Sequence, residues 1–190
     1  QVNIHNIEPA QVTESELTHL LPHTRFDIDM MYKSVLGLLD SLEHPAMRAL
    51  ARRYTDDEVL MKAFRRSPAA VVMHHAWIGG LLEHTWQLMR MADAVLATYV
   101  DDSGRPRLNR DLVIMGLFLH DLAKTTELSW HKGFAYTTDG NLVGHIARAS
   151  IWLEDCARDL DPPLATDDLA VLHNILLSHH GEPEHGALRP

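Results

Sequence analysis

The sequence contains a single cysteine, Cys156. One thiol excludes a framework of disulfide bonds within the chain and favours a reducing compartment. No partner motif for a catalytic thiol surrounds Cys156, so we expect it to be an ordinary packed residue.

The chain also lacks a long apolar run and any sign of a signal peptide. A membrane-spanning helix needs roughly 20 apolar residues. The longest apolar run, residues 112–119, is far shorter and leads directly into His120 and Asp121. The N-terminus has neither a basic region nor the apolar stretch of a secretory signal. We therefore expect a cytoplasmic protein with no membrane partner.

Positive charge is scarce. Lys and Arg number 17 against 26 Asp and Glu, which gives a formal net charge of −9. This balance argues against a basic footprint for nucleic acid over the whole surface. It leaves room for a local cationic cleft, and bound divalent metals would add positive charge at a site.

Apolar residues recur at helical spacing over most of the chain. With 190 residues, 46% of them hydrophobic, the chain is long enough for one domain with a real core. The patterns predict an all-α bundle with helices near residues 26–42, 45–54, 56–66, 75–100, 109–121, 142–160 and 167–180. Residues 132–141 are predicted to form a hairpin-like excursion that turns at Asp139-Gly140.

The long helix predicted from residue 75 is of special interest because a histidine lies on its apolar strip. That strip is predicted to face inward and comprises Trp77, Leu81, His84, Leu88, Met91 and Val95. We therefore expect the imidazole of His84 to point into the bundle.

The first residues differ from the rest of the chain. Val2 to Ile7 alternate apolar and polar residues as a short strand does, with no partner strand downstream. We interpret residues 1–19 as a linker or the tail of a missing upstream domain, and residues 20–190 as the main domain.

Histidine is abundant, with 14 residues in the chain. Four short strings place histidines on successive predicted helices: Glu83-His84-Thr85, His120-Asp121-Leu122-Ala123-Lys124, Gly144-His145-Ile146 and Ser178-His179-His180-Gly181. His84, His120, Asp121, His145, His179 and His180 are thus candidate metal ligands. Mixed histidine and carboxylate ligands suit Mn²⁺, Fe²⁺, Co²⁺, Ni²⁺ or Zn²⁺ rather than Ca²⁺.

Asp121 and Lys124 are candidate catalytic residues. Asp121 could bridge two ions about 3.5–4 Å apart, a geometry that activates water against a phosphodiester. Lys124 could then stabilise negative charge that develops on a phosphate. Each residue also has a structural interpretation: His84 as a core histidine, His145 as a helix cap, His179 and His180 as helix-end histidines, and Lys124 as surface charge.

Three further residues are candidates for binding substrate. His74 and His75 precede the long helix and could present imidazoles or backbone amides to a phosphate, although a structural role is equally favoured. Trp130 follows the His-Asp motif in a loop, where it could stack on a base.

Taken together with their flanks, residues 74–85, 120–124 and 178–182 resemble the HD-domain metal-dependent phosphohydrolase superfamily. Within it, the sequence is similar to the bacterial 3′→5′ exoribonucleases of the YhaM or CMP-binding-factor type, from about residue 20 to residue 190. The resemblance implies that His84, His120 and Asp121 bind one metal. It also implies a second metal on His145 and one of His179 and His180 with Asp121 shared, assistance from Lys124, and an OB-fold domain upstream.

One feature departs from this pattern. The HD pattern closes with a further aspartate on a later helix, and no such helix precedes Pro190. The expectation is therefore a domain truncated at its C-terminus, which binds metal less tightly than the whole protein.

The leading functional hypothesis is a metal-dependent 3′→5′ exoribonuclease that hydrolyses single-stranded RNA with metal-activated water. One alternative is an HD-type nucleotidase or nucleotide phosphodiesterase. Another is a non-catalytic nucleic-acid-binding or regulatory HD module. The expected partners are single-stranded RNA or a nucleotide, with a homo-oligomer as a further possibility.

Overall fold

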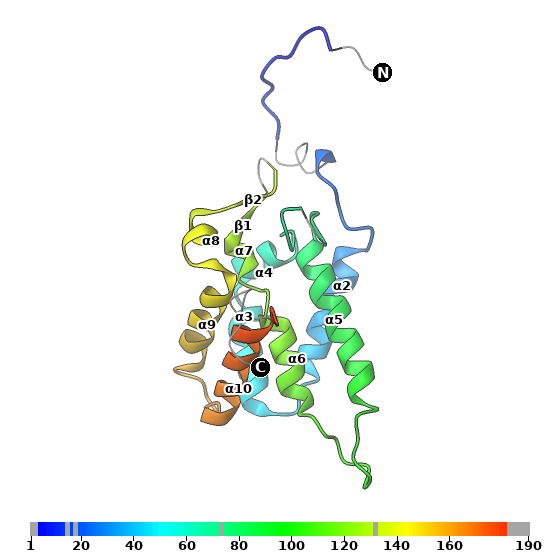
Figure 1. Cartoon of the computed structure of the whole chain (residues 1–190), viewed down its shortest axis with the longest axis vertical. Coiled ribbons are helices and arrows are strands. Elements are labelled where there is room, and N and C mark those ends of the chain that lie inside the picture. The colour runs from blue at the N-terminus through cyan, green and yellow to red at the C-terminus, as the bar shows by residue number, and fades with distance from the viewer. Residues whose placement is uncertain (1–3, 14–15, 17–18, 73, 131–132, 182–190) are drawn as a thin grey trace.

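The structure is a computed structural model that describes residues 4–13, 16, 19–72, 74–130 and 133–181. Over these residues the chain is a bundle of α-helices beside a small two-stranded sheet (Figure 1). The prediction of an all-α bundle is therefore confirmed. No helix among the described residues is long and apolar enough to cross a membrane.

Nine helices can be assigned within these residues, and most coincide with predicted ones. They are α2 (Ile28–Asp40), α3 (Pro45–Thr55), α4 (Glu58–Phe64), α5 (Gly80–Leu96), α6 (Arg110–Leu119), α7 (Lys124–Glu127), α8 (Thr138–Leu142), α9 (Gly144–Ala157) and α10 (Thr166–Ser178). Strand β1 (Leu128–Ser129) pairs antiparallel with β2 (Ala135–Tyr136), with Leu128 opposite Tyr136.

The helices pack in an order that runs from α9 through α10 and α6 to α5 and α2 (Figure 1). Their apolar faces form one continuous core that includes Leu50, Leu82, Leu153 and Leu172. At its centre the ring of Phe118 meets the rings of Tyr54 and Phe64 edge-on, with centroids 6.2 and 5.9 Å away. Such edge-to-face pairs add to the burial of the rings themselves. This core holds α6, the helix that leads into His120 and Asp121.

Polar side chains define where several helices begin. Asp27, Asp57 and Thr137 accept backbone N–H groups at the starts of α2, α4 and α8. At α6, Asn109 accepts from the backbone N–H groups of Asp111 and Leu112 at 3.0 and 3.2 Å. Each cap satisfies donors that the helix leaves unpaired at its first turn. The helix predicted over residues 109–121 therefore starts directly after its cap, Asn109.

A close approach between α6 and α10 depends on Gly116. A Cβ atom added at Gly116 would lie 2.8 Å from Cδ1 of Ile175. Because glycine has no side chain, Ile175 of α10 can pack directly against α6 at this position. Because both helices end shortly afterwards, the approach brings His120, at the end of α6, next to His179, at the end of α10.

The long helix predicted over residues 75–100 is shorter in the structure. Helix α5 begins only at Gly80, since His75 and Gly79 have left-handed backbones with φ of 59° and 80°. A Cβ atom at Gly80 would lie 2.0 Å from the carbonyl oxygen of His75, so the chain turns back on itself there.

The predicted inward strip of this helix is wrong in its second half. Met91 and Val95 are 58% and 49% exposed. The buried strip is instead Leu82, Trp86 and Met89, and it spreads to Leu81 and Thr85. Helix α5 contacts both α2 and α6. Its buried face is therefore wider than the predicted strip and rotated relative to it. His84 lies at the edge of that arc, with 28% of its side chain exposed.

The predicted strand at the N-terminus is not formed over Ile4 to Ile7, which are exposed and carry no strand pairing. The remainder of that prediction, residues 1–3, lies outside the described residues.

The hairpin begins earlier than predicted, at Leu128. Asp139 and Gly140 fall within α8 instead of forming its turn. A Cβ atom at Gly140 would lie 2.3 Å from the carbonyl oxygen of Glu127, so the lack of a side chain at Gly140 allows this close contact. Residues 131–132 of the predicted excursion lie outside the described residues.

Candidate metal centre

Asp121 lies at the centre of the histidine cluster and is only 4% exposed. Its Oδ2 atom is 3.6 Å from Nε2 of His84 and 3.4 Å from Nε2 of His120. Its Oδ1 atom is 3.5 Å from Nε2 of His145 and 3.6 Å from Nε2 of His179. One carboxylate therefore faces two pairs of imidazoles, one pair on each oxygen.

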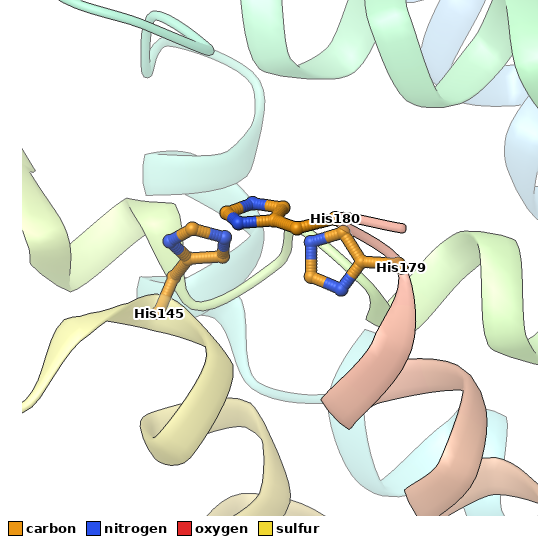
Figure 2. A group of neighbouring side chains, drawn as sticks. All are labelled: His145, His179 and His180. Atoms are coloured by element: carbon orange, nitrogen blue, oxygen red, sulfur yellow. The ribbon is translucent and has the colours of Figure 1, made fainter. Parts of the chain in front are cut away.

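These side chains come from the ends of four helices that are far apart in the sequence. His84 lies in the second turn of α5, and His145 lies in the first turn of α9. His120 and Asp121 follow α6, while His179 and His180 follow α10. Figure 2 shows His145 approaching from α9 and the other two imidazoles approaching it from the end of α10. The packing of α6 against α5 and α10 is what brings the groups together.

The ligand atoms form two groups, each compact enough for one cation. One atom each from His84, His120 and Asp121 lie within 4.8 Å of one another, as do one atom each from His145, His179 and His180. Because Asp121 presents its second oxygen to His145 and His179, the two groups share this carboxylate.

Hydrogen bonds to backbone carbonyl groups orient two of the imidazoles. Nδ1 of His120 lies 2.8 Å from the carbonyl oxygen of Leu117, and Nδ1 of His179 lies 2.8 Å from that of Leu176. A carbonyl oxygen can only accept, so each Nδ1 carries a hydrogen and Nε2 is the ring nitrogen that faces Asp121. Neutral imidazoles with Nε2 lone pairs that face the centre are in the form that binds a metal.

Three buried atoms at the centre have no hydrogen-bond partner: Oδ1 of Asp121, Nε2 of His145 and Nε2 of His179. Leaving a buried polar atom unpaired costs about 1–3 kcal/mol, and more for a charged group. A divalent cation between these atoms would satisfy all three, so the residues present fit a metal ion.

The pKa values agree with ligands in their metal-binding forms. Burial lowers the pKa of His84 to about 4, against the opposing effect of Asp121. Burial also lowers the pKa of His120. For Asp121, burial alone would raise the pKa, but His179, His120, Lys124 and His145 together hold it well below its usual range. At neutral pH the carboxylate is therefore ionised while His84 and His120 are neutral.

A cavity of about 380 Å³ opens over the centre. Its polar wall includes Lys124, whose Nζ donates to Oδ2 of Asp121 at 2.9 Å. Its apolar wall comprises Leu88, Leu117 and Ile175. A cavity lined by an ammonium group and a carboxylate together with apolar side chains suits a ligand that has both an anionic group and an apolar ring.

Of the three residues predicted to bind substrate, only His75 lies near the centre. Its ring centroid is 5.2 Å from that of His84. His74 is exposed, and Trp130 is half-buried in the loop after β1. Neither is among the described residues that line the cavity over Asp121. Their predicted roles stay predictions.

Two buried carboxylates beside the centre were not anticipated. Glu127 binds His145, and Glu83 accepts hydrogen bonds from Trp77 and Thr24. Glu83 adjoins His84 in the sequence, which was a signal that could have been used. No sequence spacing connects Glu127 with His145, because the hairpin and α8 lie between them.

The fold and the site together define a class: a helical bundle whose histidine-aspartate centre suits divalent metal ions. Curated relatives extend this result. The chain is 41% identical over 145 residues to the 3'-5' exoribonuclease YhaM of Listeria welshimeri, a match that covers 75% of this chain and 41% of the relative. It is 39% identical over 196 residues to the protein of that name in Listeria monocytogenes serotype 4b, and 30% identical over 191 residues to that in Bacillus licheniformis. Each of these two matches covers 100% of this chain and 58% of the relative.

The chain is therefore similar to exoribonucleases of the YhaM type, and the resemblance found in the sequence is confirmed. It spans 41 to 58% of the length of these relatives. No model of a protein family matches the chain, and no solved structure matches it.

Proposed function

We propose that this chain forms the catalytic part of a metal-dependent 3′→5′ exoribonuclease that hydrolyses phosphodiester bonds in single-stranded RNA. The observation that carries the proposal is the shared carboxylate of Asp121, whose two oxygens each face a pair of histidine Nε2 atoms. The relatives that bear the name 3'-5' exoribonuclease support the choice of reaction.

In this proposal, His84, His120 and Asp121 hold one divalent ion, and Asp121 with His145 and His179 or His180 holds a second. Bound divalent ions supply Lewis acidity toward phosphate oxygens and lower the pKa of water. His84 and His120 are neutral and Asp121 is ionised before any ion arrives, because burial lowers the pKa of both histidines and neighbouring groups lower that of Asp121.

Lys124 contributes a positive charge at the same cavity. Its side chain is 16% exposed, and its ammonium group reaches back to Asp121, three residues earlier in the chain. A phosphate that enters the cavity would compete with Asp121 for this ammonium group. Lys124 would then bind a phosphate oxygen and stabilise the charge that develops there during hydrolysis.

The apolar wall of the cavity provides a place for the terminal nucleoside. Leu88, Leu117 and Ile175 line the same cavity as the charged groups, so they can contact a base or ribose and exclude bulk water from the reacting phosphate. A cavity of about 380 Å³ is of a size for one nucleotide, which agrees with removal of one residue at a time from a strand end.

The test is hydrolysis of 5′-labelled single-stranded RNA by the full chain with Mn²⁺, beside single-stranded DNA and free nucleotides. We expect a ladder of products that shortens from the 3′ end. Asp121→Asn should lower the rate by at least about a hundredfold, as loss of a central electrostatic group does. The control Asp155→Asn alters an exposed carboxylate paired with Arg158 and should cleave normally. Intact RNA in a reaction that hydrolyses a free nucleotide would overturn the proposal.

A further inference from the structure

A second cavity lies beside the metal centre, on the other side of His75. It measures about 320 Å³ and is lined by His23, Arg25, Trp77 and Glu83. We refer to it as the Trp77 cavity. Its lining combines an indole, a guanidinium group and an imidazole, which are the side chains that bind single-stranded nucleic acid through stacking and phosphate contacts.

His75 lies next to one lining residue of each cavity. Its ring centroid lies 5.2 Å from the ring of His84 and 5.2 Å from the ring of Trp77. The backbone of His75 is left-handed, with φ of 59°, which is costly for a residue other than glycine. Its carbonyl oxygen accepts from the backbone N–H groups of Ala69 and Trp77 at 3.1 and 2.9 Å, and these bonds hold the strained turn. The Trp77 cavity is therefore one imidazole away from a candidate metal ligand.

The indole of Trp77 is held in place before any ligand binds. Its Nε1 donates to Oε2 of Glu83 at 2.8 Å, and the hydroxyl of Thr24 donates to the same oxygen at 2.6 Å. Glu83 itself is 5% exposed. A half-buried aromatic ring fixed by a buried carboxylate offers a rigid stacking surface, which lowers the entropy lost on binding.

The segment that carries Arg25 is attached to the same turn. Residue His23 forms a parallel bridge with Ile78, in which the backbone N–H of Thr24 donates to Ile78 at 3.0 Å and that of Ile78 donates to Pro22 at 2.8 Å. Arg25 is exposed, with its Cζ atom 5.0 Å from the centroid of the Phe26 ring, and it is thereby held in the wall of the cavity that Trp77 also lines.

Basic residues continue beyond His23. This histidine also lines a neighbouring cavity of about 450 Å³, whose wall includes Lys62, Arg65 and Arg66 together with Asp27 and Asp29. Arg65 is paired with Asp29 there. In a chain with a net charge of −9, this wall carries three cations against two carboxylates, so it is locally positive and favours an anion.

We propose that the Trp77 cavity binds the nucleotide that adjoins the one hydrolysed at the metal centre, with its base stacked on Trp77 and its phosphate held by Arg25. This inference rests on the proposed function and adds to it a second subsite for the RNA strand. A subsite of this kind favours a polynucleotide over a free nucleotide, because only a strand occupies both cavities at once.

The direct test measures binding of a short single-stranded RNA by fluorescence anisotropy, in the Asp121→Asn background so that no cleavage occurs. Arg25→Ala should weaken binding about tenfold or more, in line with the loss of one phosphate or stacking contact. Arg105→Ala removes the same charge from an exposed loop at the opposite end of α5 and should bind like the parent (Figure 1). Equal affinity in the Arg25 and Arg105 variants would overturn the inference.

Stacking is tested separately with an RNA that carries the fluorescent base 2-aminopurine next to its 3′-terminal nucleotide. Binding should quench this base, and Trp77→Leu should abolish the quenching. Because that change also removes a partner of Glu83, far-UV circular dichroism must first show that the variant keeps an intact bundle. If the variant is unfolded, Arg25→Ala, which leaves the core untouched, provides the test of the subsite. Quenching that persists in a folded Trp77→Leu variant contradicts the stacking role.

Turnover of bis(p-nitrophenyl) phosphate separates this inference from the proposed function. That small ester needs the metal centre and no second nucleotide, so Arg25→Ala should hydrolyse it at the normal rate while its KM for RNA rises about tenfold. A wild-type protein that cleaves neither substrate refutes the proposed function. If the wild-type protein cleaves RNA and Arg25→Ala leaves the KM for RNA unchanged, the subsite alone is refuted.

Discussion

The carboxylate of Glu127 holds His145 at two points. Its Oε1 atom lies 2.8 Å from Nδ1 of His145 and accepts the backbone N–H of the same residue at 3.1 Å. The second bond satisfies a donor in the first turn of α9, where negative charge is favoured. Burial would raise the pKa of Glu127, but its bonds to His145 lower it, so it stays ionised. Glu127 therefore directs Nε2 of His145 toward Asp121.

Replacing this carboxylate tests its role in metal binding. Glu127→Gln keeps an acceptor oxygen and nearly the same shape but removes the charge that makes His145 a stronger ligand. We expect metal affinity to fall about 10- to 100-fold, as for other groups that orient a ligand histidine. Isothermal titration calorimetry with Mn²⁺ measures the metal affinity, and the absorption spectrum of bound Co²⁺ reports the geometry of the metal site. Glu154→Gln is the matched control, because Glu154 lies 2.7 Å from Nε2 of His173 outside the cluster. Equal affinities in the two variants would show that Glu127 has no such role.

Metal binding should stabilise the fold. An ion that binds the folded chain alone adds about 2.7 kcal/mol at a concentration 100 times its Kd. For a domain of this size we expect Tm to rise by roughly 5 to 10 °C. Thermal unfolding followed by circular dichroism, with Mn²⁺ and with excess chelator, gives the difference. Asp121→Asn should lose most of the rise. A Tm that is the same with metal and with chelator speaks against the candidate centre.

The close packing of α6 against α10 can be tested by adding one methyl group. Gly116→Ala would place a methyl group 2.8 Å from Ile175 and force the helices apart, so we expect a loss of about 1–3 kcal/mol in the free energy of unfolding. Gly37→Ala is the control within a helix, since nothing lies within 4 Å of its added Cβ. That change should stabilise the protein by about 0.4–1 kcal/mol. Urea unfolding compares them. If both substitutions stabilise the fold, the close approach is not required.

Lys124 is expected to act on the reaction and not on the metal. Lys124→Gln removes the ammonium group that lies 2.9 Å from Asp121. Metal affinity should stay the same or rise, because a competing cation is gone, while kcat should fall about 100-fold. Lys33→Gln, an exposed change on α2, serves as the control. A variant that loses metal and activity together would place Lys124 in the structure of the site instead of its chemistry.

Local patterns were sufficient for most of the fold. The helices predicted from residues 45 and 109 begin at Pro45 and directly after Asn109, and apolar spacing predicted a helix over most of the range of each major helix. Such signals work because caps and turns depend on hydrogen bonds between residues close in sequence. These signals failed at residues 75–79, for which apolar spacing predicted a helix. Gly79, Gly80 and the strained His75 form a turn there instead.

The chain by itself determined which groups can bind metal and in what order they occur, because the His-Asp pair and the other histidines follow recognisable helical patterns. Only the tertiary structure decided that His84 and His120 face one oxygen of Asp121 while His145 and His179 face the other. It likewise decided that Glu127 binds His145. These relations depend on the rotation of each helix and on close helix contacts such as that at Gly116. Both result from packing across the whole bundle, so the spacing of residues within one helix does not predict them.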